Sequence, residues 1–308
     1  MPRVSVIIPT YNRPGLLPRA VESARRAGED VEVIVVDDAS VDETAEVCRS
    51  LPGIKYLRLE RNQGVAGARN VGLLASSADF IAFLDDDDLR LPGTLDSQLR
   101  EFERDPGLGF VCGPVLCAGQ GGELTGEVSA PKHPGGDMFW ELLNLDFPVF
   151  PLTLVMRKEC LFRVGLFERD IPGIDDWDLL VRVAEVYRGA VVTEPVGVYR
   201  LATPTSGQGT SALRSHLKLV ARGQVGLLDL PRVAAAGRAA RRAARRNALN
   251  NISDILLWNV YTWLPRGAYR YASSCLLTAL RLNPRGVLRP AAFAKGLRKL
   301  LKRVDSSQ

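Results

Sequence analysis

Four consecutive aspartates, at positions 85–88, are the residues of this chain whose type and spacing best suit metal chemistry. They follow an apolar run at 80–84, and crowding carboxylates there costs like-charge repulsion that a bound cation removes. On an extended backbone, Asp85 and Asp87 would point to the same side and form one acidic pair. Carboxylate oxygens suit Mg²⁺ or Mn²⁺, which often take one or two protein carboxylates together with substrate phosphates. The alternative interpretation is a solvated, aspartate-rich turn.

Asp37 and Asp38 end another apolar run, at 31–36. Aspartate accepts hydrogen bonds, so one of these carboxylates could accept the imide N–H of a uracil base. Both residues could equally form a turn ahead of Ala39 and Ser40. Since ligands of parallel sheets sit beyond the carboxyl ends of the strands, both acidic groups are expected to face one crevice.

Three more acids, Asp175, Asp176 and Asp178, open a helical pattern at 176–187. Acids in the first turn stabilise a helix through its macrodipole, which is a sufficient structural explanation. The functional alternative makes one of them a general base, which requires a place near the crevice. Residues 61–70 begin a further helix with glycines and two arginines. A helix N-terminus favours anions, although such glycines are more often packing devices.

The elements that must position these acids alternate between strand and helix patterns. Short β-branched runs end at proline or aspartate, and stretches with helical spacing of apolar residues separate them. This alternation predicts an α/β fold with a mostly parallel sheet covered on both faces. A run rich in Gly, Pro and Ser at 119–136 predicts a long flexible connection. The expected strands are 4–9, 31–36, 54–59, 80–84, 153–157, 190–193 and 196–199, and the expected helices are 16–27, 42–50, 65–76 and 176–187.

From residue 212 onward the pattern is helical and strongly basic. Residues 212–308 hold 19 Lys and Arg against 3 Asp and Glu, a net charge of +16, whereas residues 1–211 hold 21 against 32, a net charge of −11. This contrast predicts two parts with different electrostatic tasks, a catalytic domain at 1–211 and a basic, all-helical C-terminal region at 212–308. The expected helices are 233–249, 253–263, 269–282 and 290–304, after a loop at 202–209.

The arginine-rich run at 238–246 has several possible tasks. It could be a solvated helix face, or it could bind nucleic acid, anionic lipid or an acidic partner. No nucleic-acid-binding motif accompanies the charge, so we expect no nucleic acid partner. Arginine-rich helices close to Trp258, Tyr261, Trp263 and Tyr269 suit the surface of an anionic membrane, which predicts a peripheral membrane association.

Composition excludes several other classes of protein. The apolar fraction of 46% and the charged fraction of 24% are those of a globular protein, and no run of about 18 apolar residues predicts a membrane span. Five irregularly spaced cysteines indicate a reducing compartment, and two histidines without a CxxC pair argue against a zinc site. The N-terminus lacks a signal-peptide pattern, so we expect a cytoplasmic protein, at the inner face of the membrane if peripheral. No GxGxxG or GKS motif supports a Rossmann or P-loop site.

Several motifs, taken in order, resemble those of family 2 glycosyltransferases. They are VSVIIPTYNR at 4–13, VIVVDDAS at 33–40, GARN at 67–70 and FLDDDD at 83–88. The segment DDWDLLVR at 175–182 resembles the family's later ED helix, and Tyr199-Arg200 resembles the strand end that follows it. The similarity covers residues 2–211 in one consistent order, which is more specific than any single motif. The resemblance implies the GT-A fold, a mostly parallel sheet flanked by helices.

The resemblance also implies a mechanism. It implies inverting transfer of a sugar from a nucleotide-diphosphate donor, with UDP-sugars favoured, to a hydroxyl of a saccharide or lipid-linked acceptor, in the synthesis of cell-surface polysaccharide or glycoconjugate. Asp176 would be the catalytic base. Asp85 and Asp87 would be the DxD pair, with Asp87 on a Mn²⁺ or Mg²⁺ ion that neutralises the diphosphate. The implied donor-site residues are Pro9, Tyr11, Asp37, Asp38, Arg69, Asp85 and Asp86, with Asp37 and Asp38 on the nucleobase and ribose.

Two positions depart from the family's pattern. Asp175 stands where the family commonly has glutamate, so this acid reaches one methylene less far. Ala202 stands where many members have a metal-binding histidine. The resemblance therefore leaves the third protein ligand of the metal unassigned.

Two other functions are compatible with parts of this pattern. A non-catalytic nucleotide-sugar-binding protein would be favoured by the loss of Asp85, Asp87 or Asp176, and all three are present. A sugar nucleotidyltransferase would need a glycine-rich, basic signature near the N-terminus, which residues 9–15 do not supply. A metal-dependent glycosyltransferase is the function that the sequence favours.

Overall fold

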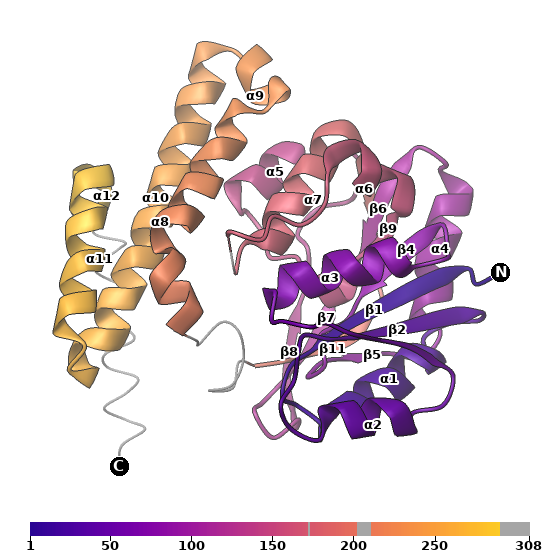
Figure 1. Cartoon of the computed structure of the whole chain (residues 1–308). Coiled ribbons are helices and arrows are strands. Elements are labelled where there is room, and N and C mark those ends of the chain that lie inside the picture. Colours follow the sequence, from indigo (N-terminus) through magenta and orange to yellow (C-terminus); the bar gives the residue numbers. More distant parts are fainter. Residues whose placement is uncertain (172, 202–210, 290–308) are drawn as a thin grey trace. The chain divides into compact units, whose positions relative to one another are not determined.

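The computed structural model describes residues 1–171, 173–201 and 211–289 (Figure 1). The chain divides into two compact units, Met1–His216 and Leu217–Gln308. The loop expected at 202–209, the position of Ala202 and the helix expected at 290–304 lie outside the described residues.

A seven-stranded sheet forms the centre of the first unit, in the order β10-β6-β9-β4-β1-β2-β3. Strands β1, β2, β3 and β4 run parallel, and β9 pairs antiparallel with both β4 and β6. The expected mostly parallel sheet is therefore confirmed. The strands are β1 (Val4–Thr10), β2 (Val31–Asp37), β3 (Ile54–Arg58), β4 (Phe80–Phe83), β6 (Leu108–Cys112), β9 (Val155–Arg157) and β10 (Arg188–Val191).

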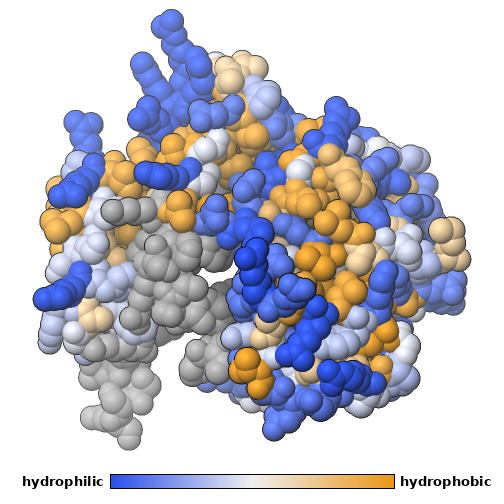
Figure 2. Space-filling view, viewed as in Figure 1, coloured by the Kyte–Doolittle hydropathy of each residue, from blue (hydrophilic) through white to orange (hydrophobic). Residues whose placement is uncertain are grey.

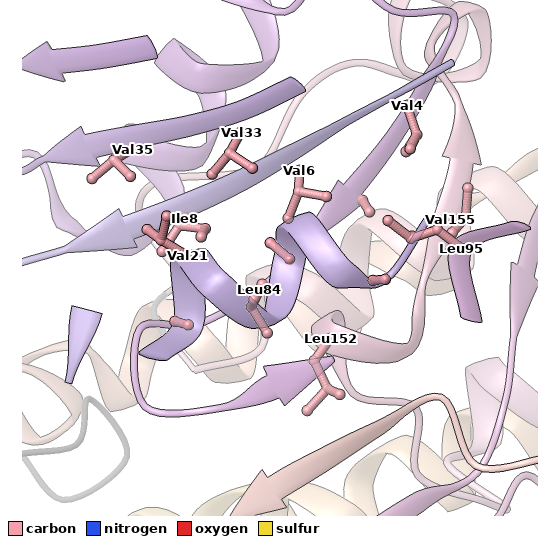
Figure 3. Close-up of a cluster of buried hydrophobic side chains, with 14 of the residues drawn as sticks. Val4, Val6, Ile8, Val21, Val33, Val35, Leu84, Leu95, Leu152 and Val155 are labelled. Atoms are coloured by element: carbon pink, nitrogen blue, oxygen red, sulfur yellow. The ribbon is translucent and has the colours of Figure 1, made fainter. Parts of the chain in front are cut away.

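Helices cover both faces of this sheet (Figure 1). Every residue of β1 is buried, which explains its unbroken apolar sequence, because side chains alternate between two covered faces. One face packs on α1, and the labelled residues of Figure 3 come from this apolar cluster. The other face packs on α3. The helices are α1 (Leu17–Arg26), α2 (Thr44–Ser50), α3 (Gly64–Ala75), α4 (Thr94–Arg104), α5 (Phe139–Asn144), α6 (Lys158–Val164) and α7 (Asp175–Val186).

A second, four-stranded sheet has the order β5-β11-β7-β8. Its outer strand β8 lies inside the segment 119–136, for which a long flexible connection was expected, so that expectation was wrong. The side chains of β8 are almost all exposed, so the strand carries no apolar signal, and backbone pairing with β7 holds it in place. The strands are β5 (Leu89–Arg90), β7 (Val115–Ala118), β8 (Leu124–Ser129) and β11 (Gly197–Arg200).

The described part of the second unit is helical. Residues 238–263, which span most of the helix expected at 233–249 and all of the one expected at 253–263, form one continuous helix, α10, of 26 residues, while residues 233–235 belong to α9. Its apolar side chains pack against Cys275 and Ala279 of α11. None of the helices in the described residues combines the length and the apolar content that crossing a bilayer requires. The helices from residue 211 onward are α8 (Ser211–Gly226), α9 (Pro231–Ala235), α10 (Arg238–Trp263), α11 (Tyr269–Leu282) and α12 (Pro284–Val287).

Close packing of α3 on the sheet predicts a large effect of a small substitution. A Cβ at Gly72 would lie 2.5 Å from Cγ2 of Ile7 and 3.2 Å from Cγ2 of Val36. Gly72→Ala should therefore lower the free energy of unfolding by about 1–3 kcal/mol, despite the better helix propensity of alanine. Urea denaturation measures this effect. Gly15→Ala is the control. A Cβ added at Gly15 would meet no atom within 4 Å beyond its chain neighbours, so this substitution should be close to neutral. Equal stability of both variants would contradict this packing.

Candidate active site

The carboxyl ends of β1, β2 and β4 lie together, which brings two acidic groups to one rim of the sheet. In the register of the sheet Thr10 is opposite Asp37, and the backbone N–H of Asp38 donates to the carbonyl of Thr10 at 2.9 Å. On the other side of β1, the N–H of Leu84 donates to the carbonyl of Ile7 at 3.0 Å. The strand order therefore places the aspartates after β2 and those after β4 on either side of the end of β1.

The run of four aspartates forms a turn, so the expected extended backbone was wrong. The N–H of Asp88 donates to the carbonyl of Asp85 at 3.1 Å. This turn brings carboxylate oxygens of Asp85, Asp87 and Asp88 within 4.8 Å of one another. An all-oxygen donor set suits a hard divalent cation such as Mg²⁺ or Mn²⁺. Asp88 joins the expected pair because of the turn, which the sequence analysis did not anticipate.

Asp86 is not among these three carboxylates and has partners of its own. It is 4% exposed, accepts a hydrogen bond from the hydroxyl of Thr10 at 2.7 Å, and pairs with Nη1 of Arg13 at 2.7 Å. Burial raises the pKa of Asp86 to about 6, against the opposing effects of Arg13 and Thr10. Nη1 of Arg13 also lies 3.0 Å from Asp87. Sequence reasoning missed Arg13, although it ends the first motif.

Arg69 links the acidic turn to the start of α7. It is 3% exposed, and its Nη2 lies 2.6 Å from Asp85 while its Nη1 lies 3.2 Å from Asp175. The guanidinium also stacks on Phe167, 5.5 Å from the ring centroid. Burial by itself lowers the pKa of Arg69. The attraction of the Asp85 and Asp175 carboxylates is the larger effect, so the pKa is raised above its ordinary value. Arg69 was expected to line the donor site, and both its amino groups are engaged by acids.

The three acids at the start of α7 have different surroundings. Asp175 is buried against Arg69, and Asp178 pairs with Arg182 at 2.7 Å. Asp176 is partly exposed, and its Oδ1 accepts the N–H of Trp177 at 2.8 Å. Burial and the neighbouring Asp175 raise the pKa of Asp176, while Arg69 opposes this shift. A carboxyl with a raised pKa is suited to accept a proton near neutral pH.

Asp37 and Asp38 are both engaged by protein donors. Asp37 is fully buried and accepts hydrogen bonds from the N–H of Ser40 at 2.8 Å and the hydroxyl of Tyr56 at 2.9 Å. Asp38 accepts the N–H groups of Gln63 at 2.6 Å and Gly64 at 2.9 Å, so its charge stabilises the N-terminus of α3.

The two other expected donor-site residues lie in and after β1. Pro9 is buried in the strand, whereas Tyr11, just after it, is 45% exposed. The exposed ring of Tyr11 is therefore available to a ligand at this rim.

Comparison with known proteins points to one family. Residues 5–165 match the family model described as glycosyl transferase family 2. A Haemophilus influenzae protein named an uncharacterized glycosyltransferase is 30% identical over 189 residues, which are 59% of this chain and 62% of that protein. A Campylobacter jejuni GalNAc(5)-diNAcBac-PP-undecaprenol beta-1,3-glucosyltransferase is 42% identical over 107 residues, 33% of this chain and 35% of that protein. The chain thus spans less than two thirds of either relative.

A solved structure shares the fold. The crystal structure of S. aureus TarS residues 1–349 in complex with UDP-GlcNAc has a TM-score of 0.57 and 16% identity, and the match covers 89% of this chain and 90% of that one. At this level of identity the likeness shows the fold, which agrees with the expected GT-A architecture.

The buried position of Arg69 predicts a large cost of removing it. Arg69→Met would leave Asp175 as a buried, unpaired charge, and should lower the free energy of unfolding by about 3–5 kcal/mol. Urea denaturation is the measurement, with Arg61→Met, at an exposed position ahead of the same helix, as the control. Adding Asp175→Asn to Arg69→Met should restore part of the loss. No recovery in the double variant would show that the ion pair does not explain the cost.

Proposed function

Because the chain belongs to glycosyltransferase family 2, we propose that it transfers a sugar from a nucleotide-diphosphate sugar, preferably a UDP-sugar, to an acceptor hydroxyl with inversion at the anomeric carbon. One observation carries this proposal. Arg69 joins Asp85, one of three carboxylates suited to a divalent cation, to Asp175, which directly precedes the proposed base Asp176. The name of the C. jejuni relative, a glucosyltransferase, and the UDP-GlcNAc in the TarS structure support the choice of donor.

The donor nucleotide is proposed to lie over the ends of β1 and β2, beside Pro9 and Tyr11. Asp37 and Asp38 are the proposed contacts of the nucleobase and ribose, since a carboxylate has about four acceptor positions and each of these accepts two hydrogen bonds. Because Asp37 is fully buried, its contact requires the Ser40 segment to open.

The diphosphate is proposed to lie at the acidic turn. Asp87, with Asp85 and Asp88 beside it, would hold Mn²⁺ or Mg²⁺, and this ion when bound neutralises the diphosphate and stabilises it as a leaving group. Arg69 holds Asp85 in place through the 2.6 Å contact, and therefore acts as a positioning residue. Asp86 fixes the turn to the end of β1 through its hydrogen bond with Thr10, and its proposed effect on the donor is indirect.

Asp176 is the proposed general base. Its carboxylate would accept the proton of the acceptor hydroxyl as that oxygen attacks the anomeric carbon from the side opposite the diphosphate. One displacement at one carbon inverts its configuration. The interaction of Asp176 with Asp175, Arg69 and Asp85 supports its place in the same centre as the acidic turn.

If Asp176 is the general base, its replacement should lower the rate of sugar transfer and leave the binding of the donor intact. Asp176→Asn should lower the transfer rate by about 10²–10⁴-fold and leave donor affinity, measured by calorimetry, unchanged. Because only the ionised base accepts a proton, the wild-type rate should fall as the pH is lowered through the raised pKa of Asp176. Asp170→Asn, at an exposed acid nearby, is the control and should transfer normally. Full activity of Asp176→Asn would assign the base elsewhere.

Thermal stabilisation by UDP-, GDP- and dTDP-sugars in the presence of Mn²⁺ identifies the donor. Stabilisation by one donor class without transfer to any acceptor would favour the alternative function, a non-catalytic nucleotide-sugar-binding protein. Transfer of a nucleotidyl group to a sugar phosphate would favour a nucleotidyltransferase.

The second unit is proposed to hold the enzyme at an anionic membrane, where a lipid-linked acceptor would be found. Five exposed arginines of α10 recur at intervals of three and four residues, which places them on one face of the helix. Residues 217–289 hold two acids, Asp229 and Asp254, against 13 Lys and Arg, and Asp254 pairs with Arg289. The five exposed arginines of α10 are Arg238, Arg241, Arg242, Arg245 and Arg246.

Helix α11 exposes apolar side chains on the second unit. Small residues of α11 face its core, whereas Leu276, Leu277 and Leu280 are 36%, 53% and 38% exposed among the described residues. Figure 2 shows apolar surface over the second unit with hydrophilic residues beside it. Exposed leucines together with arginines suit the boundary between lipid headgroups and acyl chains.

If the second unit docks on a membrane, replacing its arginines should weaken binding to anionic vesicles without lowering the rate of donor hydrolysis. Replacing Arg241, Arg242, Arg245 and Arg246 with Gln should weaken binding to anionic vesicles at low salt by about 1 kcal/mol per arginine, and should leave donor hydrolysis nearly unchanged. Co-sedimentation with anionic and with neutral vesicles measures this. Four exposed arginines of the first unit replaced in the same way provide the control, which should bind like the wild type. Wild-type protein that stays in the supernatant with anionic vesicles would refute membrane docking.

A further inference from the structure

Arg13 is a second cation, besides Arg69, that directly contacts one of the three carboxylates suited to a metal. Its Nη1 lies 3.0 Å from Oδ2 of Asp87 and 2.7 Å from Oδ1 of Asp86. Asp87 is one of the three carboxylates that suit a divalent ion, whereas Asp86 is not. A metal ion and the guanidinium would repel each other and would compete for the same carboxylate.

The backbone around Arg13 is held in place from several sides. Asn12 adopts a positive φ of 53°, donates from its N–H to Oγ of Ser40 at 2.9 Å, and accepts the N–H of Val41 at 2.9 Å. The N–H of Arg13 itself donates to Oγ1 of Thr44 at 3.2 Å. The side chain is 17% exposed. The contact with the acidic turn is therefore built into the loop after β1, and is not a chance position of a long surface side chain.

Asp86 allows Arg13 to release Asp87 without becoming unpaired. Asp86 is buried, also accepts the hydroxyl of Thr10 at 2.7 Å, and lies outside the group of three carboxylates. When a divalent ion takes Asp87, Arg13 can keep its 2.7 Å contact with Asp86. A diphosphate adds negative charge to this centre, which favours holding the metal ion and the guanidinium there together.

We propose that Arg13 competes with the metal for Asp87 when no donor is bound, and turns toward the diphosphate when metal and donor bind together. This inference rests on the proposed metal-dependent function. In this arrangement Arg13 makes metal affinity depend on the nucleotide, and by linkage the nucleotide's affinity depends equally on the metal. The arginine is thus a specificity-determining residue for a metal–diphosphate complex over the free metal.

The test measures Mn²⁺ binding by electron paramagnetic resonance, with and without UDP. The wild-type protein should bind Mn²⁺ at least about tenfold more tightly with UDP than without it, a difference of 1.4 kcal/mol. Arg13→Gln should bind Mn²⁺ alone about tenfold more tightly than the wild type, and should gain less from UDP. Arg13→Lys, which keeps the charge, should behave more like the wild type than like Arg13→Gln.

Arg19→Gln is the matched control for general electrostatics. Arg19 lines the pocket beside the acidic turn together with Asp86, Asp87 and Asp88, but it has no ion pair with them among the described residues. Its replacement should change Mn²⁺ affinity less than Arg13→Gln does. Equal Mn²⁺ affinity of wild type and Arg13→Gln would overturn this inference alone, as would a wild-type protein that binds Mn²⁺ equally well without UDP. No Mn²⁺ binding by any variant, with or without UDP, would overturn the metal-dependent function as well.

Discussion

The crowding of negative charge at one rim of the central sheet is the constraint on which the rest of this structure depends. Asp37 ends β2 and Asp38 follows it, and four further aspartates follow β4 on the other side of β1. Buried carboxylates without partners would cost several kcal/mol each, so each needs a cation or a set of N–H donors. Arg13 and Arg69 supply the cations, and the backbone at the start of α3 supplies donors.

Helix α3 both packs on the central sheet and carries Arg69, which contacts the acidic turn. Its N-terminus is held by Asp38, its side toward the sheet approaches Ile7 so closely that only glycine fits at Gly72, and Arg69 leaves the same helix toward the acidic turn. The position of the guanidinium is therefore set by the core of the sheet. In turn, Arg69 fixes the start of α7 through Asp175, which places Asp176 beside it.

The two units differ in the sign of their net charge and in where their charged residues lie. The first unit concentrates acids at one rim of its sheet, and residues 1–216 hold 22 Lys and Arg against 32 Asp and Glu, a net charge of −10. The second unit, residues 217–308, holds 18 Lys and Arg against 3 Asp and Glu, a net charge of +15, and contains no group of acids that suits a metal among its described residues. Its core is built from small and aliphatic side chains between α10 and α11, which leaves the arginines at the surface.

The sequence by itself determined the strand–helix alternation, the acidic strand ends and the family, because β-branched runs, helical periodicity and motif order are local properties of the chain. It did not show that β8 is a strand, since that strand is held by backbone pairing with β7 and not by an apolar face. Nor did it show that the four aspartates form a turn. In this turn Asp86 is buried, and Asp88 joins the group of carboxylates that suits a metal.

The partners of each acid were decided by the tertiary structure alone. Arg13 and Asp87 are 74 residues apart, and Arg69 and Asp175 are 106 apart. No local pattern in the sequence indicates which of several arginines meets which of several aspartates. The strand order settles this, because it places the ends of β1, β2 and β4 side by side and brings α3 and α7 to the same rim, where only certain side chains can reach one another.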